Sequence, residues 1–411
     1  MIEKIVQENT PVLLAENDLS IARLLLKNYP NQPFYIKNNQ LIFDSYIVGE
    51  LRLKDLLIKI EPRNAALNLN NIFQITTYLS AQNINPEFDI PEYGSSMSGG
   101  MGSIVKKFTE SVINLLQYGL TGLIENNQSY SKNIKGRLTF KMFHPLEVAL
   151  KGVNVISSLH SPNTSTNQII KSAIQKLLII ELDNASRSEL TALLRDFDNI
   201  DSYAGDIGTI STLVENYQSS NPHYPLVIEY SLIILKNLKI GYRNGKLDSY
   251  AFLVNSNDVF EKYVLKILKK ELGRKVEKLL QPQKYAVIRS SDGREGNKSF
   301  SPDILVEYDI DNKKCLAVFD TKNKDFNPEL NNLSEIVSSQ DIYQLIFYCM
   351  TLNTKLGGLI YPSLSDQSPL ELMVSTDKDL KLFLISINMN RSFKDQVSKL
   401  IQEINKLLIY A

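Results

Sequence analysis

Residues 301–324 read SPDILVEYDIDNKKCLAVFDTKNK, and this stretch decides how the last third of the chain folds. Two apolar runs flank the polar segment 309–314, a pattern typical of two antiparallel strands joined by a tight turn. Asp303 opens the first strand and Asp320 closes the second, 17 positions later. Because such a hairpin returns the end of its second strand to the start of its first, the two aspartates are expected to converge on one site.

Two convergent carboxylates beside a lysine suit the hydrolysis of a phosphodiester. That reaction needs charge neutralisation on the phosphate and a hydroxide at neutral pH, and Mg²⁺ or Mn²⁺ held by carboxylates and waters serves both needs. Lys322 is expected on the same face of the strand as Asp320, where its ammonium can align water or stabilise phosphate charge. Thr321 is expected to point the other way and to offer the metal its backbone carbonyl. The predicted metal ligands are therefore Asp303, Asp320 and the Thr321 carbonyl.

The same pattern has a plainer interpretation, because aspartates at strand ends are usually turn formers or solvated. The run CLAVF before Asp320 weighs against it, since a continuous apolar run is typical of a strand buried on both faces. A carboxylate at the end of such a strand needs a partner or a metal.

Two residues outside the hairpin are candidates for the same site. Glu261 lies near the start of a predicted helix over 257–276, which can present a carboxylate to the metal. The alternative is a surface glutamate that favours a helix N-terminus. Gln344 lies on a predicted helix over 338–352 and can hold water or phosphate by its amide. The alternative there is an ordinary polar position on a helix.

A basic helix face is a candidate for DNA binding. Four lysines of the helix over 257–276 share one face, which predicts a stripe that follows phosphates, although a solvated face is the plain alternative. These are Lys262, Lys266, Lys269 and Lys270. The whole chain has 45 Lys and Arg against 45 Asp and Glu, which argues against a strongly nucleic-acid-coating protein but allows a local basic groove.

The periodicity of the apolar residues predicts a mixed α/β chain of three parts, and 411 residues suffice for two or more domains. Residues 1–100 are expected to be β-rich, residues 101–245 mainly helical, and residues 246–411 an α/β domain. A Gly- and Ser-rich segment at 85–102 is expected to be a loop or linker.

Composition limits the location and the metal chemistry. Cys315 and Cys349 sit inside apolar runs, which favours free buried thiols and a cytoplasmic location. No apolar stretch approaches the length needed to cross a bilayer. The three histidines are scattered, so a zinc site is not expected and a bound metal must be held by oxygen.

Eight segments, in order, resemble motifs of the McrC family, the nuclease subunit of modified-cytosine restriction systems. They are IKIEPRNAALNLNNIFQITTYL (58–79), IKGRLTF (134–140), STNQIIKSAIQKL (165–177), NPHYPLVIEYSLIIL (221–235), NSNDVFEKYV (255–264), PDILV (302–306), VFDTKNK (318–324) and SQDIYQLIFY (339–348). The last four are similar to the family's "M-N-x-L-F-E-x-Y-V", "P-D-I", "D-x-K-Y/W-K" and "D-x-Y-Q-x-x-x-Y".

This resemblance implies a C-terminal restriction-endonuclease-like domain of the PD-(D/E)xK type. It implies Mg²⁺-dependent DNA cleavage in phage defence, with Asp303, Asp320 and Lys322 as catalytic residues and Glu261 as the helix carboxylate. It also implies that the N-terminal part binds and activates a hexameric, McrB-like AAA+ GTPase that translocates double-stranded DNA. GTP is expected on that partner, since the closest imitation of a P-loop here, GYRNGKL (241–247), is one residue short and ends in Leu247.

The chain departs from the family pattern at a few positions. Asn323 follows Lys322 where an aromatic residue is usual, and Ser256 and Asp258 fit the helix motif loosely. Neither departure removes a predicted metal ligand. Two other functions stay open: a nuclease-dead adaptor of an AAA+ ring, and a stand-alone repair nuclease of the same fold. The intact Asp303, Asp320 and Lys322 favour an enzyme over the adaptor. Arg63, Arg137 and the 85–102 segment are candidates for stimulating the partner.

Overall fold

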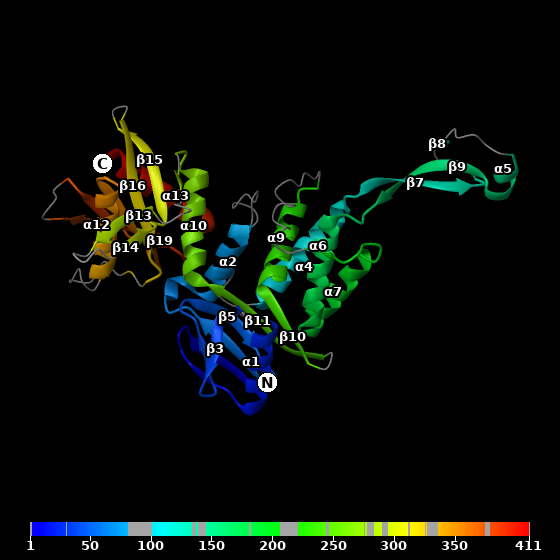
Figure 1. Cartoon of the computed structure of the whole chain (residues 1–411), viewed down its shortest axis with the longest axis horizontal. Coiled ribbons are helices and arrows are strands. Elements are labelled where there is room, and N and C mark those ends of the chain that lie inside the picture. The colour runs from blue at the N-terminus through cyan, green and yellow to red at the C-terminus, as the bar shows by residue number, and fades with distance from the viewer. Residues whose placement is uncertain are drawn as a thin grey trace. The chain divides into compact units, whose positions relative to one another are not determined.

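A computed structural model gives the structure of the chain, which divides into two compact units (Figure 1). Unit 1 comprises Met1–Ser103 and Asn237–Ala411, and unit 2 comprises Ile104–Lys236. The structure describes residues 2–410 except 30, 81–100, 134–136, 139–144, 181, 206–220, 244–245, 275, 278–282, 290–294, 311–312, 325, 327–335 and 375–378. Most of the predicted 85–102 linker therefore lies outside the described residues.

This division differs from the predicted three parts because one sheet of unit 1 joins the two ends of the chain. Its strands run in the order β1 (Ile2–Gln7), β6 (Leu56–Glu61), β5 (Ile47–Arg52), β11 (Lys246–Asn255) and β10 (Leu238–Arg243). The predicted boundary after residue 245 thus falls within the antiparallel β10–β11 pair. Sequence periodicity cannot show a pairing between strands about 200 residues apart, so the shared sheet was not predicted.

Gly49 is the position where β5 and β11 meet most closely. It pairs with Leu253 and adopts a φ of 131°, a conformation that disfavours other residues. A Cβ atom at this position would lie 2.1 Å from the Phe252 carbonyl oxygen. The glycine therefore allows the late strand β11 to join the early strand β5.

The rest of the N-terminal part packs only partly on this sheet, because its last helix lies against residues 256–271 instead. It comprises β2 (Val12–Leu13), α1 (Glu16–Asn28), β3 (Phe34–Lys37), β4 (Gln40–Phe43), η1 (Ala65–Leu67) and α2 (Leu69–Ser80). Asn38 and Asn39 form the tight turn between β3 and β4, with φ of 50° and 59°. Tyr78 of α2 packs edge-on against Tyr263.

The C-terminal part is built on a six-stranded sheet of the predicted α/β kind. Its order is β12 (Val276–Glu277), β15 (Ile304–Ile310), β16 (Lys313–Thr321), β17 (Leu356–Ser363), β19 (Lys381–Asn388) and β18 (Leu370–Met373). β15 and β16 form the predicted antiparallel hairpin, and β16, β17 and β19 run parallel. A separate hairpin, β13 (Gln283–Arg289) and β14 (Glu295–Phe300), precedes β15.

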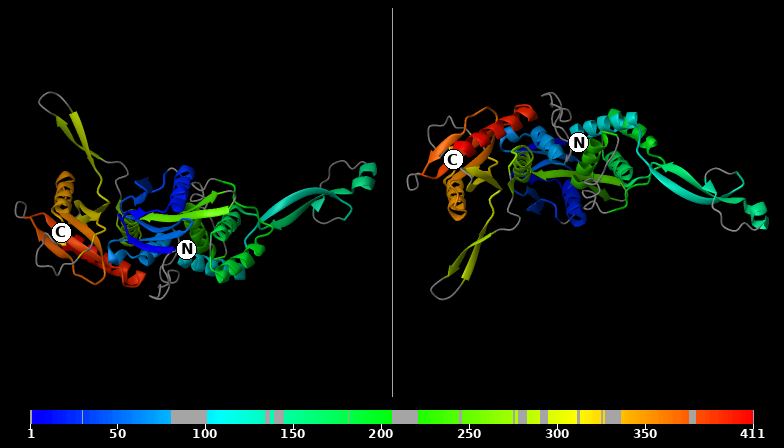
Figure 2. Two further views of the ribbon diagram at one scale, coloured as in Figure 1. Left: turned by 90° about the horizontal axis from the view of Figure 1, so that it is seen from below. Right: turned by 90° about the horizontal axis from the view of Figure 1, so that it is seen from above.

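Helices cover this sheet, as Figures 1 and 2 show. α12 (Ser339–Thr351) packs its buried Leu345 and Cys349 in one apolar cluster with Val318, Leu359 and Leu382 of the strands. α10 (Ser256–Glu271) contacts β16, and α13 (Phe393–Tyr410) contacts β19. The side chain of Val318 faces α12, and alternation along β16 places Asp320 on that same face.

Unit 2 is mainly helical, as predicted for this stretch. Its helices are α4 (Met101–Tyr118, which begins in unit 1), α5 (Pro145–Lys151), α6 (Ser165–Ile179), α7 (Asn184–Asp196) and α9 (Tyr224–Asn237). A three-stranded sheet of β7 (Leu123–Ser131), β9 (Val153–Ser161) and the short β8 (Arg137–Leu138) interrupts them. Within the described part of the chain, no helix has the length and apolar character needed to cross a membrane.

Candidate active site

The hairpin brings the two predicted aspartates together at the carboxyl end of β16. Ile304 pairs with Phe319, so Asp303 and Asp320 are the next opposite positions. Asp303 Oδ2 accepts hydrogen bonds from the Thr321 amide (2.8 Å) and the Thr321 hydroxyl (2.7 Å). The Asp320 side chain lies just inside this edge and its residue is only 3% exposed. The convergence expected from the sequence is therefore present.

Thr321 makes contacts in the site that the sequence did not predict. The prediction used only its backbone carbonyl, on the ground that its side chain points away. In the structure its hydroxyl and its amide both hold the Asp303 carboxylate. Asp303 lies opposite the end of β16, so its carboxylate accepts from both groups of Thr321, a contact that strand alternation alone does not predict. A metal-binding role of the Thr321 carbonyl stays a prediction.

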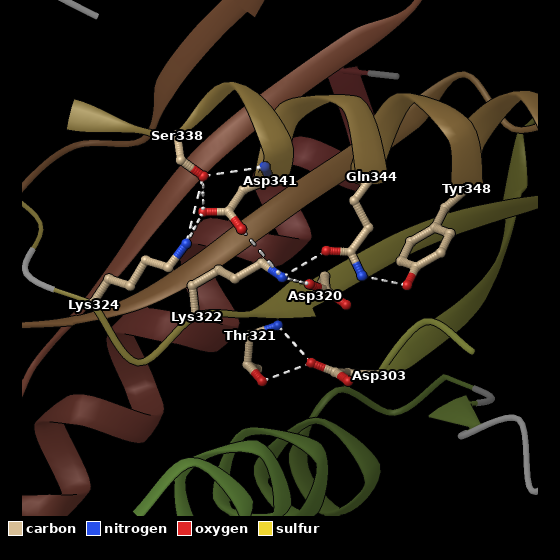
Figure 3. A network of polar contacts seen from close by, with 9 residues as sticks. All are labelled: Asp303, Asp320, Thr321, Lys322, Lys324, Ser338, Asp341, Gln344 and Tyr348. Carbon is tan, nitrogen blue, oxygen red and sulfur yellow. Dashed lines mark hydrogen bonds and ion pairs between the residues drawn. The ribbon is translucent and has the colours of Figure 1, made fainter. Parts of the chain in front are cut away.

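Lys322 lies beside Asp320, as strand alternation predicted. Its Nζ is 2.5 Å from Asp320 Oδ2 and donates to Gln344 Oε1 at 2.9 Å (Figure 3). A third oxygen, Asp341 Oδ1, lies 3.6 Å away. The lysine side chain is 14% exposed, so its ammonium is held mainly by these three protein groups.

Gln344 faces the site, and its partners differ from those expected. The sequence suggested that its amide holds water or phosphate. Its Oε1 instead accepts from Lys322, and its Nε2 donates to Tyr348 Oη at 2.5 Å. One turn of α12 separates Gln344 from Tyr348, which allows this contact. Gln344 therefore orients the lysine, and a direct contact with water or phosphate stays a prediction.

Asp341 is the site residue that the sequence interpretation missed. It lies in the first turn of α12, where Ser338 caps the helix by accepting from the Asp341 amide. Its carboxylate contacts Lys322 through Oδ1 and Lys324 Nζ through Oδ2, the latter at 2.5 Å. An acidic residue in a first helical turn is ordinarily explained by the favourable charge at a helix N-terminus, so Asp341 does not stand out in the sequence. The usable signal was its place at the head of the quoted "D-x-Y-Q-x-x-x-Y" pattern.

The carboxylates of the site differ in their acidity. Burial and the nearby Asp320 charge raise the pKa of Asp303. Burial also raises the pKa of Asp320, although Lys322 acts against it. Burial acts in the same direction on Asp341, but hydrogen bonds from Lys324 and Ser338 outweigh it and lower the pKa of that carboxyl. Burial thus outweighs the nearby Lys322 charge at the aspartate pair, whereas hydrogen bonds outweigh burial at Asp341.

This donor set fits a hard divalent cation. Carboxylate oxygens are the ligands that Mg²⁺ and Mn²⁺ prefer, and Mg²⁺ commonly takes one or two carboxylates and completes its shell with water. Burial is the main cause of the raised pKa values of Asp303 and Asp320, and the Asp320 charge adds to it at Asp303; a cation bound between the two carboxylates would act against both effects. Asp303 and Asp320 are the residues that would hold it.

Glu261 stays a prediction. It lies on α10, as expected, and is partly buried. Over the residues that the structure describes, no group of three or more His, Cys, Asp or Glu side chains is close enough to hold a metal ion. Glu261 therefore does not complete a three-carboxylate site with Asp303 and Asp320 in this structure.

The predicted lysine stripe on α10 is interrupted at Lys266. The Lys266 ammonium donates to the Tyr78 carbonyl oxygen at 2.6 Å and lies 4.5 Å from the centre of the Tyr78 ring. It binds the C-terminal end of α2, where helix carbonyls and the helix dipole favour a cation. Lys262, Lys269 and Lys270 are exposed, and Lys270 lies 3.8 Å from Glu271. The prediction that all four lysines form a stripe available to phosphates is thus wrong for Lys266.

Two departures from the family pattern meet in space. Asn323 Nδ2 donates to Ser256 Oγ at 2.9 Å, and both residues are buried. Asn323 replaces an aromatic residue, and Ser256 stands where the quoted motif has methionine. Two polar residues that stand where the motifs have an aromatic residue and a methionine thus form a buried hydrogen bond. It ties the start of α10 to the residue that follows Lys322.

Comparisons with known proteins agree with this fold. In a refined half-complex from a tetradecameric assembly of Thermococcus gammatolerans McrB AAA+ hexamers with bound McrC, one chain matches with a TM-score of 0.64. It is 16% identical, and the match covers 98% of this chain and 100% of that one. A chain of the Thermococcus gammatolerans McrBC complex matches with a TM-score of 0.46 and 13% identity, over 67% of this chain and 89% of that one. No curated protein sequence matches.

The sequence itself matches a protein family over residues 43–362, well over half of the chain. The family is described as McrBC 5-methylcytosine restriction system component. This range includes both aspartates, Lys322 and Gln344, and the structural match supports the resemblance to McrC drawn from the motifs. The chain therefore belongs to the McrBC 5-methylcytosine restriction system family.

Proposed function

We propose that this chain is the DNA-cleaving subunit of a McrBC-like restriction complex in phage defence. The observation that carries the proposal is the pair of the half-buried Asp303 and the buried Asp320, with Lys322 at 2.5 Å from Asp320. The reaction is the metal-dependent hydrolysis of a phosphodiester bond in double-stranded DNA, and the cation is Mg²⁺ or Mn²⁺. When bound, such a cation supplies positive charge for the phosphate and lowers the pKa of water at the site.

The chain's own residues have separate tasks in this proposal. Asp303 and Asp320 hold the cation, and the two hydrogen bonds from Thr321 fix the direction of the Asp303 carboxylate. The Lys322 ammonium has three donors, and one of them can turn to a phosphate oxygen or to the attacking water. Gln344 and Asp341 hold the ammonium at the edge of the sheet. The burial of Asp320 excludes bulk water and strengthens these charge interactions.

We further propose that an AAA+ GTPase hexamer is the partner, with GTP bound by that partner. The matched McrC chain was seen with McrB AAA+ hexamers, which supports this assignment. Unit 2 offers a surface for such a contact. Exposed apolar residues lie on β7 and α5, where solvent exposure of each is 54–73%: Leu123, Ile124, Tyr130, Leu146 and Leu150. Leu146 and Leu150 are neighbours on α5, and adjacent apolar side chains left in water commonly mark a protein interaction surface.

The nuclease proposal is tested by Asp320→Ala in the complete complex with partner, GTP, Mg²⁺ and DNA. Cleavage should fall on the order of 10³-fold, because the variant loses a cation ligand and the partner of Lys322. Asp309→Ala is the matched control, since Asp309 is an exposed aspartate at the far end of β15. Unchanged cleavage by Asp320→Ala would exclude this site as the nuclease and would favour the adaptor function. Full cleavage by the unaltered chain without partner and GTP would indicate a stand-alone nuclease.

The partner proposal is tested by the double variant Leu146→Ser and Leu150→Ser. Both side chains lie on α5, are 65% and 69% exposed, and are one helical turn apart. Their loss should weaken binding to the AAA+ ring about tenfold or more while the thermal unfolding of the chain stays unchanged. Met373→Ser, an apolar residue 93% exposed on β18, serves as the control. Equal loss of binding in both variants would contradict a specific role of α5.

A further inference from the structure

We infer that Asp341 is a positioning residue that receives the Lys322 ammonium when a divalent cation occupies Asp320. This inference rests on the proposed function, because it concerns the state of the site with the cation bound. It assigns a task to a residue that takes no part in the predicted metal site.

Lys322 and a bound cation would compete for the Asp320 carboxylate. Asp320 Oδ2 already lies 2.5 Å from the Lys322 ammonium. A magnesium ion binds carboxylate oxygens at about 2.1 Å. An ammonium and a divalent cation that share one buried carboxylate repel each other strongly, since screening by water is weak there. Lys322 therefore has to shift away from Asp320 when the cation binds, yet it must stay at the site to act.

Asp341 supplies the second anion. Its Oδ1 lies 3.6 Å from Lys322 Nζ, just beyond hydrogen-bond distance, so a small movement of the ammonium makes the contact. Gln344 Oε1, 2.9 Å from the same Nζ, can keep its hydrogen bond throughout. Figure 3 shows the Lys322 ammonium between the Asp341 carboxylate on one side and Asp320 and Gln344 on the other.

The other oxygen of Asp341 is fixed in place. Oδ2 accepts from Lys324 at 2.5 Å and from the Ser338 hydroxyl at 2.7 Å. Ser338 is itself the N-cap of α12, so the carboxylate is anchored to the start of a helix. An anchored carboxylate keeps its position when Lys322 moves, which a flexible surface acid would not do.

The charges of the group agree with this task. Asp303, Asp320 and Asp341 carry three negative charges when ionised, and Lys322 and Lys324 carry two positive ones. Lys324 compensates Asp341 from outside, where its side chain is 47% exposed. Lys322 is then shared between Asp341 and the aspartate pair. Transfer of the ammonium towards Asp341 leaves the aspartate pair free for the cation.

The test measures Mn²⁺ binding to the full chain by the electron paramagnetic resonance signal of free Mn²⁺. Asp341→Asn keeps the shape of the side chain and removes its charge, and it should weaken binding about tenfold or more. Lys322→Met removes the competitor and should bind Mn²⁺ at least as tightly as the unaltered chain. The deciding variant carries both changes and should bind Mn²⁺ as tightly as Lys322→Met alone. Without the lysine there is no ammonium for Asp341 to hold, so its charge should no longer affect Mn²⁺ binding.

Equal weakening by Asp341→Asn with and without Lys322 would overturn the inference, because Asp341 would then act on the cation directly. No weakening by Asp341→Asn would overturn it as well. Asp309→Asn controls for the loss of a distant charge, and circular dichroism confirms that each variant is folded. Cleavage assays add a second readout, in which Asp341→Asn lowers kcat and leaves the KM for DNA unchanged.

The proposed function fails in a distinguishable way. If Asp303→Asn does not weaken Mn²⁺ binding, or if the unaltered chain binds none, the aspartate pair is not a cation site and the inference falls with it. If Asp303→Asn abolishes binding but Asp341→Asn leaves it intact, only the inference about Asp341 is lost.

Discussion

The C-terminal part contains two buried acidic regions that differ in arrangement. At the end of β16, Asp303 and Asp320 lie opposite each other with Lys322 in contact. On α13, Glu403 is buried and its closest cation, Lys399, is 4.0 Å away. Its Oε2 has no hydrogen-bond partner among the residues that the structure describes. Both regions raise carboxyl pKa values, for Glu403 to about 7, mainly through burial.

The difference teaches that a raised pKa does not by itself make a site. A cation site needs two hard ligands that converge, and of these two regions the end of β16 provides them. Lys399 is already bound to Asp366 at 2.9 Å, so the Glu403 region is a structural network in which one lysine is shared between a buried and a partly exposed carboxylate.

The largest effect is expected from removing the lysine of each region. Lys322→Met should lower DNA cleavage about 10²- to 10³-fold, because a positioned charge donor is lost at the reacting phosphate. Lys399→Met should leave cleavage unchanged. The measurement is the single-turnover cleavage rate of the complete complex. Similar losses in both variants would show that the two regions are not functionally distinct.

The second prediction concerns pH and Glu403. The pKa of Glu403 rises from 4.5 to about 7 in the folded chain. The carboxyl therefore stays protonated to a higher pH in the folded state than in the unfolded state. Stability should therefore be unaffected below pH 4.5, fall as pH rises towards 7, and stay low above it. Glu403→Gln should remove this fall, a gain on the order of 3 kcal/mol at most at pH 8.

Urea unfolding of both proteins at pH 5 and pH 8 measures the effect of Glu403→Gln. The same variant should bind Mn²⁺ as the unaltered chain does, which Asp303→Asn should not. A loss of Mn²⁺ binding in Glu403→Gln would place Glu403 in the cation site and remove the contrast.

A smaller effect is expected at the hydrogen bond between Asn323 and Ser256. Ser256→Ala leaves the buried Asn323 amide without its partner and should destabilise the chain by about 1–2 kcal/mol. Asn323→Ala in the Ser256→Ala background should then add little, since the unpaired group is gone. Equal and additive losses in a double-mutant cycle would show that the two residues act independently.

The smallest effect is expected at Lys324. Its side chain is 47% exposed, so its ion pair with Asp341 should contribute about 0.5 kcal/mol or less to stability. Lys324→Gln should accordingly unfold at nearly the same urea concentration as the unaltered chain. A loss several times larger would mean that Asp341 depends on this lysine for its position far more than the exposure indicates.

The sequence predicted the centre of the site because that centre is local. Asp303, Asp320 and Lys322 belong to one hairpin, whose turn and alternation fix the register and the facing of side chains. Gln344 was placed on the right helix, but its partner was not predicted. Asp341 was missed because a polar residue in a first helical turn has an ordinary explanation. Which side chains a helix presents to a strand depends on packing that no short pattern encodes.

The sequence by itself determined the family, the β15–β16 hairpin with its two aspartates, and the helical character of unit 2. These features rest on contacts between near neighbours or on ordered motifs along the chain. Only the tertiary structure decided that residues 237–255 complete the sheet begun by residues 2–61, and that Lys266 binds the end of α2. It alone also placed Asp341 against Lys322. The physical reason is distance along the chain. Strand pairing and helix packing join segments that are far apart in the sequence, and neither segment alone shows which partner it will pack against.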